Sequence, residues 1–140
     1  MLTLAWNNLA KQRYICANQP DPENAMKFLI LVKSNPGLEA QIDAMDQAEM
    51  RKSMDAMGVF NEELRKAGVL KDCEGLRPTK EAKRVHFDGP TRNVADGPFQ
   101  GDLVAGYWIW ELPSIDEAVA WVKRCPNPMP TPSDIEIRPI

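Results

Sequence analysis

The sequence predicts one α+β domain, in which an antiparallel sheet carries two helices on one of its faces. Three observations lead to this fold class: segments with strand-like and helix-like patterns alternate, both helical segments begin with capping signals, and the composition is that of a globular protein. Of the 140 residues, 44% are apolar and 26% are charged, which is enough apolar chain for one buried core.

The composition also excludes several classes of protein. The net charge of -3 and the absence of a basic stripe argue against nucleic acid as a partner. No apolar run approaches the roughly 20 residues that cross a bilayer, so we expect no membrane association. Three widely spaced cysteines, Cys16, Cys73 and Cys125, with a single histidine, favour free thiols in the cytoplasm over a disulfide framework or a zinc site.

Residues 1–25 are expected to be an N-terminal extension, and residues 26–140 the domain. The breaker cluster at residues 19–22 (QPDP) separates the extension from Met26, where the first convincing strand opens. Translation from an early start codon would explain such an extension.

The first half of the domain contains two strand signals and a hairpin. Residues 28–32 (FLILV) are apolar at every position, which predicts a central strand covered on both faces. Asn35-Pro36-Gly37 is expected to end that strand, and residues 69–78 to form a short edge segment. Residues 84–87 and 92–95, joined by Asp-Gly-Pro, predict a hairpin inserted in the middle of the domain.

A long helix is expected between the first strand and the edge segment. Asp46 and Glu49 have the spacing of a capping box, and Gly68 is a typical C-terminal stop. Gly58 inside the helix indicates close packing at that point. An apolar stripe is expected to face the core, although its methionines could instead form a pliable binding surface: Met50, Met54, Met57, Phe60 or Asn61, and Leu64.

The stretch from Val94 to Leu112 (VADGPFQGDLVAGYWIWEL) organises the domain. A sharp turn is expected at residues 96–98, with Gly97 free to adopt a positive φ, before a long aromatic strand starts at Leu103. Alternation places two sets of side chains on opposite faces of this strand: Leu103, Ala105, Tyr107 and Ile109 against Val104, Gly106, Trp108 and Trp110.

A second helix and a last strand complete the predicted order. Ser114 and Glu117 form a capping box, Pro126 ends the helix, and residues 135–138 (IEIR) form a strand with its isoleucines inward. The order is the ferredoxin-like βαββαβ pattern, enlarged by the hairpin. Both helices then cover one face of the sheet, and large aromatic rings on the other face need a cover, for which a second copy of the chain is the simplest choice.

Two groups of side chains are candidates for function. His86 and Asp96 could form an acid–base pair if the hairpin brings them together, although Asp96 could equally bond the backbone of its own turn. The other candidate is an aromatic wall for a ligand, with rings from Phe99, Tyr107, Trp108 and Trp110. Arg138 is available for a ligand carboxylate, or for an ion pair with Glu136 or Glu111.

Two functions follow, and they belong to different classes. The first is a dimeric module that binds a small metabolite, and the second is a cofactor-free enzyme that uses His86 and Asp96 for proton transfer. No glycine-rich phosphate loop, nucleophile elbow or cluster of metal ligands is present in the sequence, so we predict no cofactor and no metal.

The residues also resemble a known family. Residues 94–99 (VADGPF) are similar to the motif that names the DGPF domain proteins of the YCII-related superfamily. Further similar segments follow in family order, at residues 26–32, 62–70, 75–78, 106–108, 116–118, 124–126 and 135–139. Residues 100–103 depart from the family pattern, because they lack its usual lysine and glutamates.

The resemblance implies a bacterial, homodimeric α+β barrel made of two sheets packed face to face. It implies no established reaction, although a His–Asp pair in a pocket has been proposed for related proteins. It also implies that residues 1–25 fall outside the domain.

Overall fold

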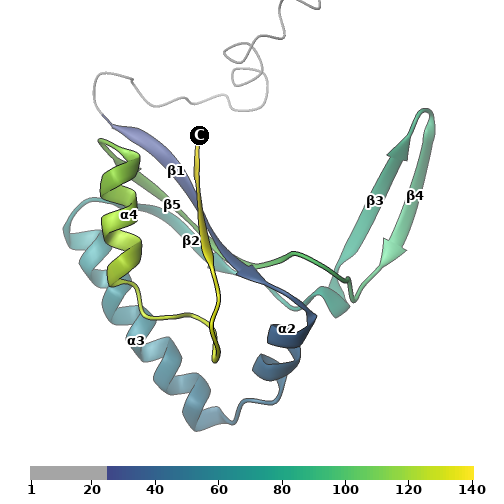
Figure 1. Cartoon of the computed structure of the whole chain (residues 1–140), viewed down its shortest axis with the longest axis horizontal. Coiled ribbons are helices and arrows are strands. Elements are labelled where there is room, and N and C mark those ends of the chain that lie inside the picture. The colour runs from purple at the N-terminus through teal and green to yellow at the C-terminus, as the bar shows by residue number, and fades with distance from the viewer. Residues whose placement is uncertain (1–24) are drawn as a thin grey trace, which may run out of the picture.

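A four-stranded antiparallel sheet is the centre of the fold (Figure 1). The structure is a computed structural model that describes residues 25–140. The strands lie in the order β2-β5-β1-β6, so the predicted central strand is central. Their bounds are β1 (Met26–Ser34), β2 (Leu70–Gly75), β5 (Leu103–Leu112) and β6 (Ile135–Pro139). Of the extension predicted at residues 1–25, all but residue 25 lies outside the described residues.

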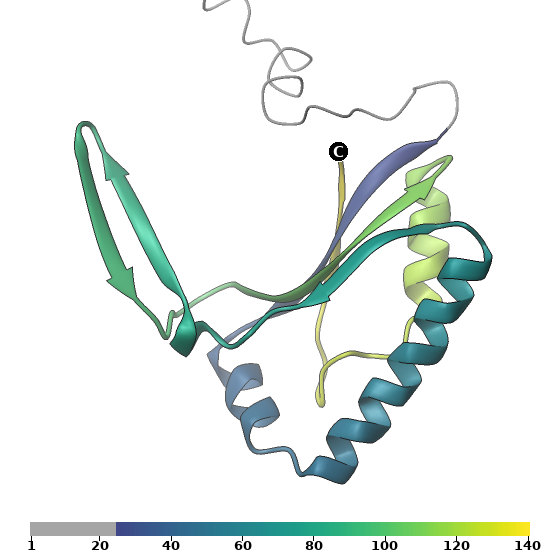
Figure 2. The same cartoon turned by 180° about the vertical axis from the view of Figure 1, so that it is seen from behind.

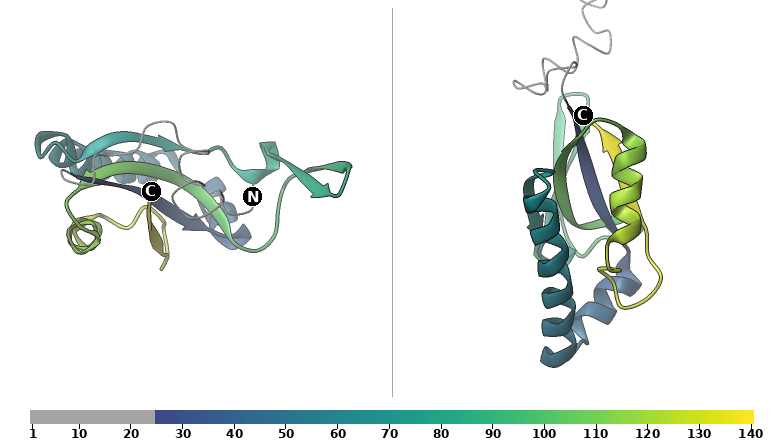
Figure 3. Two further views of the ribbon diagram at one scale, coloured as in Figure 1. Left: turned by 90° about the horizontal axis from the view of Figure 1, so that it is seen from above. Right: turned by 90° about the vertical axis from the view of Figure 1, so that its left-hand side faces the viewer.

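Helices cover one face of this sheet, as predicted (Figures 1 and 3). The capping signals mark where two of them begin: Asp46 Oδ1 accepts a hydrogen bond from Glu49 N (2.8 Å), and Ser114 Oγ accepts one from Glu117 N (3.2 Å). The helices are α2 (Pro36–Asp43), α3 (Gln47–Lys66) and α4 (Ile115–Arg124). None of the helices in the described part of the chain is long and apolar enough to cross a membrane.

Strand β1 ends just before residues 35–37, as expected, but the sequence did not predict the helix α2 that begins there. Asn35 is the N-cap of the helix, because its Oδ1 accepts a hydrogen bond from Leu38 N at 2.9 Å. Pro36 occupies the first helical position, where its missing N–H and fixed φ are well tolerated. The same residues that end β1 therefore start a helix at once.

The core lies between the sheet and the helices, and it contains both tryptophans of β5. Trp110 is fully buried and Trp108 is 4% exposed. The Phe60 ring of α3 packs against them, with centroid distances of 6.3 Å to Trp108 and 6.2 Å to Trp110. The expectation that large aromatic rings on the face opposite the helices are covered by a second copy is therefore wrong for the two tryptophans, because alternation along a strand does not tell which face the helices cover.

The opposite face of the sheet is open. It carries the residues that alternate with the core, and they are half-buried: Leu29, Leu31, Tyr107 and Ile109. Charged side chains of the edge strands surround them, including Asp72 and Arg138.

The predicted stripe of α3 faces the core only in the C-terminal half of the helix. Phe60 and Leu64 are buried, whereas Met54 is 66% exposed. A Cβ added at Gly58 would have no neighbour within 4 Å, so close packing there is also wrong. The helix is longer than the sheet beneath it and diverges from it toward its N-terminus (Figure 2), so the pattern continues where the core has ended.

The hairpin forms as predicted, but it is a separate two-stranded sheet rather than part of the main one. Strands β3 (Lys83–Asp88) and β4 (Thr91–Asp96) project away from the helices (Figures 1 and 2) and are exposed along their whole length. A short 3-10 turn, η2 (Thr79–Glu81), precedes the hairpin.

Gly97 is required for space rather than for its backbone angle. A Cβ at this position would lie 1.6 Å from the carbonyl oxygen of Thr79, and Gly97 N donates a hydrogen bond to Ala82 O at 2.9 Å. The positive φ expected there is not adopted. The turn is thus held directly against the η2 segment.

Candidate functional site

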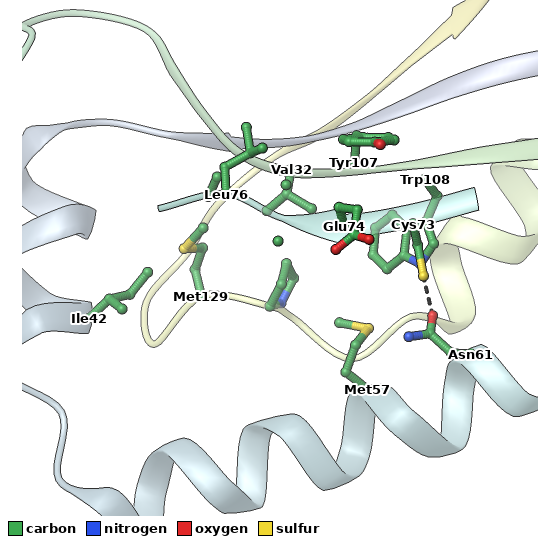
Figure 4. Close-up of a pocket in the computed structure, with 14 residues that line it drawn as sticks. Val32, Ile42, Met57, Asn61, Cys73, Glu74, Leu76, Tyr107, Trp108 and Met129 are labelled. Carbon is green, nitrogen blue, oxygen red and sulfur yellow. Dashed lines mark hydrogen bonds between the residues drawn. The ribbon is translucent and has the colours of Figure 1, made fainter. Parts of the chain in front are cut away.

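A cleft of about 390 Å³ opens between the helix-covered side of the sheet and α3 (Figure 4). It lies where α3 diverges from the strands, with α2 at one end and the loop after α4 behind it (Figure 4). Most of its walls are apolar, from Val32, Ile42, Met57, Leu76, Trp108 and Met129, and its polar groups come from Asn61, Cys73 and Glu74.

The helical repeat of α3 and the strand pairing of the sheet bring these residues together. Met57 and Asn61 are four residues apart on α3 and therefore share one face of the helix. Cys73 of β2 pairs in register with Trp108 of β5, so both side chains lie on the same side of the sheet. Met129, from the proline-rich loop, is 6% exposed and closes one wall.

Asn61 is the main polar group of the cleft. Its Oδ1 accepts a hydrogen bond from Trp108 Nε1 at 2.8 Å, and this fixes the orientation of the amide, because an indole N–H can only donate. The amide nitrogen is then turned toward the cleft, beside Met57 (Figure 4), and has no hydrogen-bond partner among the described residues. It is available to donate to a ligand.

The thiol of Cys73 contributes apolar surface rather than a nucleophile. Burial is the largest cause that raises its pKa, and the nearby carboxylates of Asp72 and Glu74 add to this effect, while Arg65 opposes it. A raised pKa leaves the thiol protonated near neutral pH, whereas nucleophilic chemistry needs the thiolate.

The structure does not bring His86 and Asp96 together. His86 pairs in register with Asn93, and Asp96 pairs with Lys83, to which its carboxylate is bound by a salt bridge. Because Lys83 and His86 are an odd number of residues apart on β3, Asp96 and His86 lie on opposite faces of the hairpin. Both are exposed, and neither lines the cleft.

The other predicted ligand residues are divided among several places. Trp108 lines the cleft, whereas Trp110 is enclosed in the core. Tyr107 borders the cleft, but its ring lies on the other side of the strand (Figure 4), where its hydroxyl donates to Asp72 Oδ2 at 3.1 Å. This hydrogen bond is the largest cause that raises the pKa of Tyr107.

Phe99 and Arg138 lie outside the cleft. The guanidinium of Arg84 lies over the Phe99 ring, 4.0 Å from its centroid. Arg138 makes an ion pair with Glu136 at 3.3 Å, which was one of the two alternatives expected for it.

Sequence reasoning missed most of the residues that line the cleft. Met57 and Asn61 were recognised as part of the α3 stripe, where core packing was the favoured interpretation. For Cys73 the sequence predicts only a free thiol. Met129 carried no signal at all, because nothing in a proline-rich loop indicates which side chain turns inward.

Fold and cleft together define an α+β protein with a small, mainly apolar pocket between its sheet and its helices. The sequence model of the YCII-related domain matches residues 26–140, so the chain belongs to the family of YCII-related domain proteins. An uncharacterised protein of Rhizobium meliloti (strain 1021) is 25% identical over 104 residues, which cover 73% of this chain and 84% of the relative.

Proposed function

We propose that this protein binds a small, mostly apolar molecule in the cleft lined by Met57, Asn61 and Trp108. The observation that carries the proposal is the cleft itself: about 390 Å³ of space with apolar walls and one amide that is free to donate a hydrogen bond. Pockets that hold small ligands typically have this character, with volumes of about 300–1,000 Å³ and few polar groups that fix orientation.

The expected ligand follows from these walls. Met57, Met129 and Trp108 offer polarisable, apolar surface that suits an alkyl or ring-containing group. Each buried methylene contributes about 0.8 kcal/mol, so affinity should rise about fourfold with each carbon added to a linear ligand. A ligand hydroxyl or carbonyl oxygen would accept from the Asn61 amide.

A chemical-shift titration with 1-hexanol tests the proposal. We expect the amide resonances of Cys73, Gly75 and Gly106 to shift in a saturable manner, because these residues line the cleft. Met57→Trp should fill the cleft and abolish the shifts. Met54→Trp is the matched control, since Met54 lies on the same helix, does not line the cleft and is 66% exposed.

Two outcomes would contradict binding in the cleft. One is the absence of saturable shifts at millimolar 1-hexanol. The other is a set of shifts confined to the open sheet face, around Leu29 and Ile109, that persists in Met57→Trp.

We also propose a ferredoxin-like arrangement and a homodimer formed through the open sheet face. The sheet order supports the arrangement, because the first and third strands of the βαββαβ pattern, β1 and β5, are its central strands, and the β3–β4 hairpin is the insertion. The half-exposed Leu29, Leu31 and Ile109 support the dimer, because a second sheet would cover them.

Light scattering after size exclusion tests the dimer on the full chain. We expect the mass of two chains, and we expect Ile109→Glu to give one chain, because it places a charge on the open face. Val119→Glu, on the exposed side of α4, is the control and should remain dimeric. A wild-type mass of one chain would refute this part of the proposal.

A further inference from the structure

A smaller recess adjoins the cleft at its α2 end. Its volume is about 290 Å³, and Ile42, Leu76 and Ala105 line both spaces, so the recess and the cleft are direct neighbours. The rest of its lining is more polar than that of the cleft, with side chains from Ser34, Glu39, Asp43 and Arg77.

Ser34 brings an unpaired hydroxyl to this recess. The residue ends β1 and is only 5% exposed, and its Oγ is buried without a hydrogen-bond partner among residues 25–140. Buried polar groups are rarely left unpaired in folded proteins, and an exception at the wall of a cavity points to a bound group that completes it. A hydroxyl can accept from such a group or donate to it.

Glu39 brings a carboxylate without a counter-ion. Its two oxygens accept hydrogen bonds from Thr79 N and from Thr79 Oγ1, both at 2.6 Å. Both donors are neutral, and no Lys or Arg of the described chain forms a salt bridge with Glu39. Each carboxylate oxygen has a second lone pair, so the group can accept further hydrogen bonds.

The other charges around the recess already have partners. Asp43 lies 3.6 Å from the Nζ of Lys80, and the Arg77 guanidinium lies 3.2 Å from the carboxylate of Glu81. Glu39 is therefore the charge at this recess that lacks an opposite charge. A half-buried carboxylate of this kind favours a cation and disfavours an anion.

We propose that the ligand of the cleft carries a cationic amine at one end, and that Glu39 and Ser34 hold this amine in the recess. The proposal rests on the proposed function, because the apolar part of the same molecule occupies the cleft. The ammonium donates to Glu39 and to Ser34 Oγ, which supplies both groups with the partner that the chain itself does not provide. A carboxylate-bearing ligand is excluded by the same charge.

Two probes with the same six-carbon tail test the proposal on the full chain: 1-hexylamine and 1-hexanol. We expect 1-hexylamine to bind about tenfold more tightly than 1-hexanol. The hydrogen bond between its ammonium and the Glu39 carboxylate joins two charged groups, and it is stronger than the neutral hydrogen bond that a hydroxyl makes with the Asn61 amide. Glu39→Gln should remove most of this preference, because glutamine carries no charge. Glutamine keeps the shape of the side chain, and the Thr79 hydroxyl can accept from its amide.

Asp88→Asn is the matched control for charge. It removes one carboxylate from the hairpin, away from the recess, and should leave both affinities unchanged. A preference that arises only from the net charge of -3 would fall equally in Asp88→Asn and Glu39→Gln. Ser34→Ala should weaken 1-hexylamine binding severalfold while circular dichroism confirms the fold.

The outcomes separate the two proposals. If 1-hexanol binds in the cleft but 1-hexylamine binds no more tightly, or if Glu39→Gln and Asp88→Asn have equal effects, the amine site is refuted and the apolar cleft stands. If neither probe binds to the wild-type protein, both proposals are refuted.

Discussion

The hydrogen bond from Trp108 to Asn61 joins the core to the cleft, and a double-mutant cycle measures it. Asn61→Leu replaces the amide with an apolar side chain of similar size. It leaves the buried Nε1 of Trp108 without its acceptor, which lies 2.8 Å away in the wild type. Stranding a buried donor costs about 1–3 kcal/mol, so we expect the free energy of unfolding to fall by that amount.

Trp108→Phe removes the N–H and so provides the reference for the cycle. In that background Asn61→Leu has no donor to strand, and we expect it to change the free energy of unfolding by less than about 0.5 kcal/mol. Urea unfolding of the wild type, the two single variants and the double variant, fitted with one shared m-value, gives the four free energies of unfolding from which the coupling energy is calculated. Additivity within about 0.3–0.5 kcal/mol would refute the assignment of this hydrogen bond.

Three further predictions concern backbone space and thiol burial. Gly58→Ala should raise the free energy of unfolding by about 0.5–1 kcal/mol, since its Cβ meets nothing. Gly68→Ala should lower the free energy of unfolding, because Gly68 has a φ of 73°. Melting temperatures that shift in the same direction for both variants would contradict this. Gly97→Ala should severely destabilise the turn, because its Cβ would collide with Thr79 O. Amide hydrogen exchange in the hairpin of this variant at the same rates as in the wild type would contradict this prediction. Burial raises the pKa of Cys125 from 9.0 to about 11, so alkylation at pH 9 should be far slower than in urea.

The raised pKa of Cys125 also makes the free energy of unfolding depend on pH, and urea unfolding curves recorded at several pH values measure this dependence. The unfolded thiol loses its proton near pH 9.0 and the folded one only near pH 11, so protonation favours the folded chain. This contribution is complete below pH 9 and is lost as the pH rises toward 11. A Cys125→Ser variant should lose less stability than the wild type over that interval.

Local signals predicted most of the elements correctly, because each depends on neighbouring residues. The caps at Asp46 and Ser114 and the stop at Gly68 need only a few residues of sequence, and all three mark helix ends in the structure. Asn35-Pro36 correctly marked the end of β1, but the helix that follows was not predicted, because the same dipeptide suits a turn and a helix start. Leu38, in the first turn of this helix, is buried in the core cluster.

The candidate site could not be predicted in the same way, because it depends on which surfaces meet. The alternation in β5 correctly separated Tyr107 from Trp108, but the identity of the covered face depends on where α3 and α4 pack. His86 and Asp96 could form an acid–base pair only if the hairpin brought them together. Pairing in the hairpin then fixed them on opposite faces, a consequence of register that the sequence motif did not reveal.

A mismatch in length between α3 and the sheet explains why the cleft exists. The helix has 20 residues and spans about 30 Å, whereas the neighbouring edge strand β2 has six residues and spans about 20 Å. Phe60 and Leu64 pack on the sheet, and beyond them the helix diverges from it. Met57 and Asn61 lie at the point of divergence, so their side chains meet the cleft instead of the core.

Trp108 belongs both to the core and to the wall of the cleft, so a ligand bound as proposed would contact the core directly. A molecule that binds only the folded chain stabilises it by about 2.7 kcal/mol at a concentration of 100 times its Kd. Thermal stabilisation can therefore screen for the natural ligand without any knowledge of a reaction. A genuine ligand should lose its effect in Met57→Trp and keep it in Met54→Trp, whereas a molecule that stabilises both variants equally binds elsewhere.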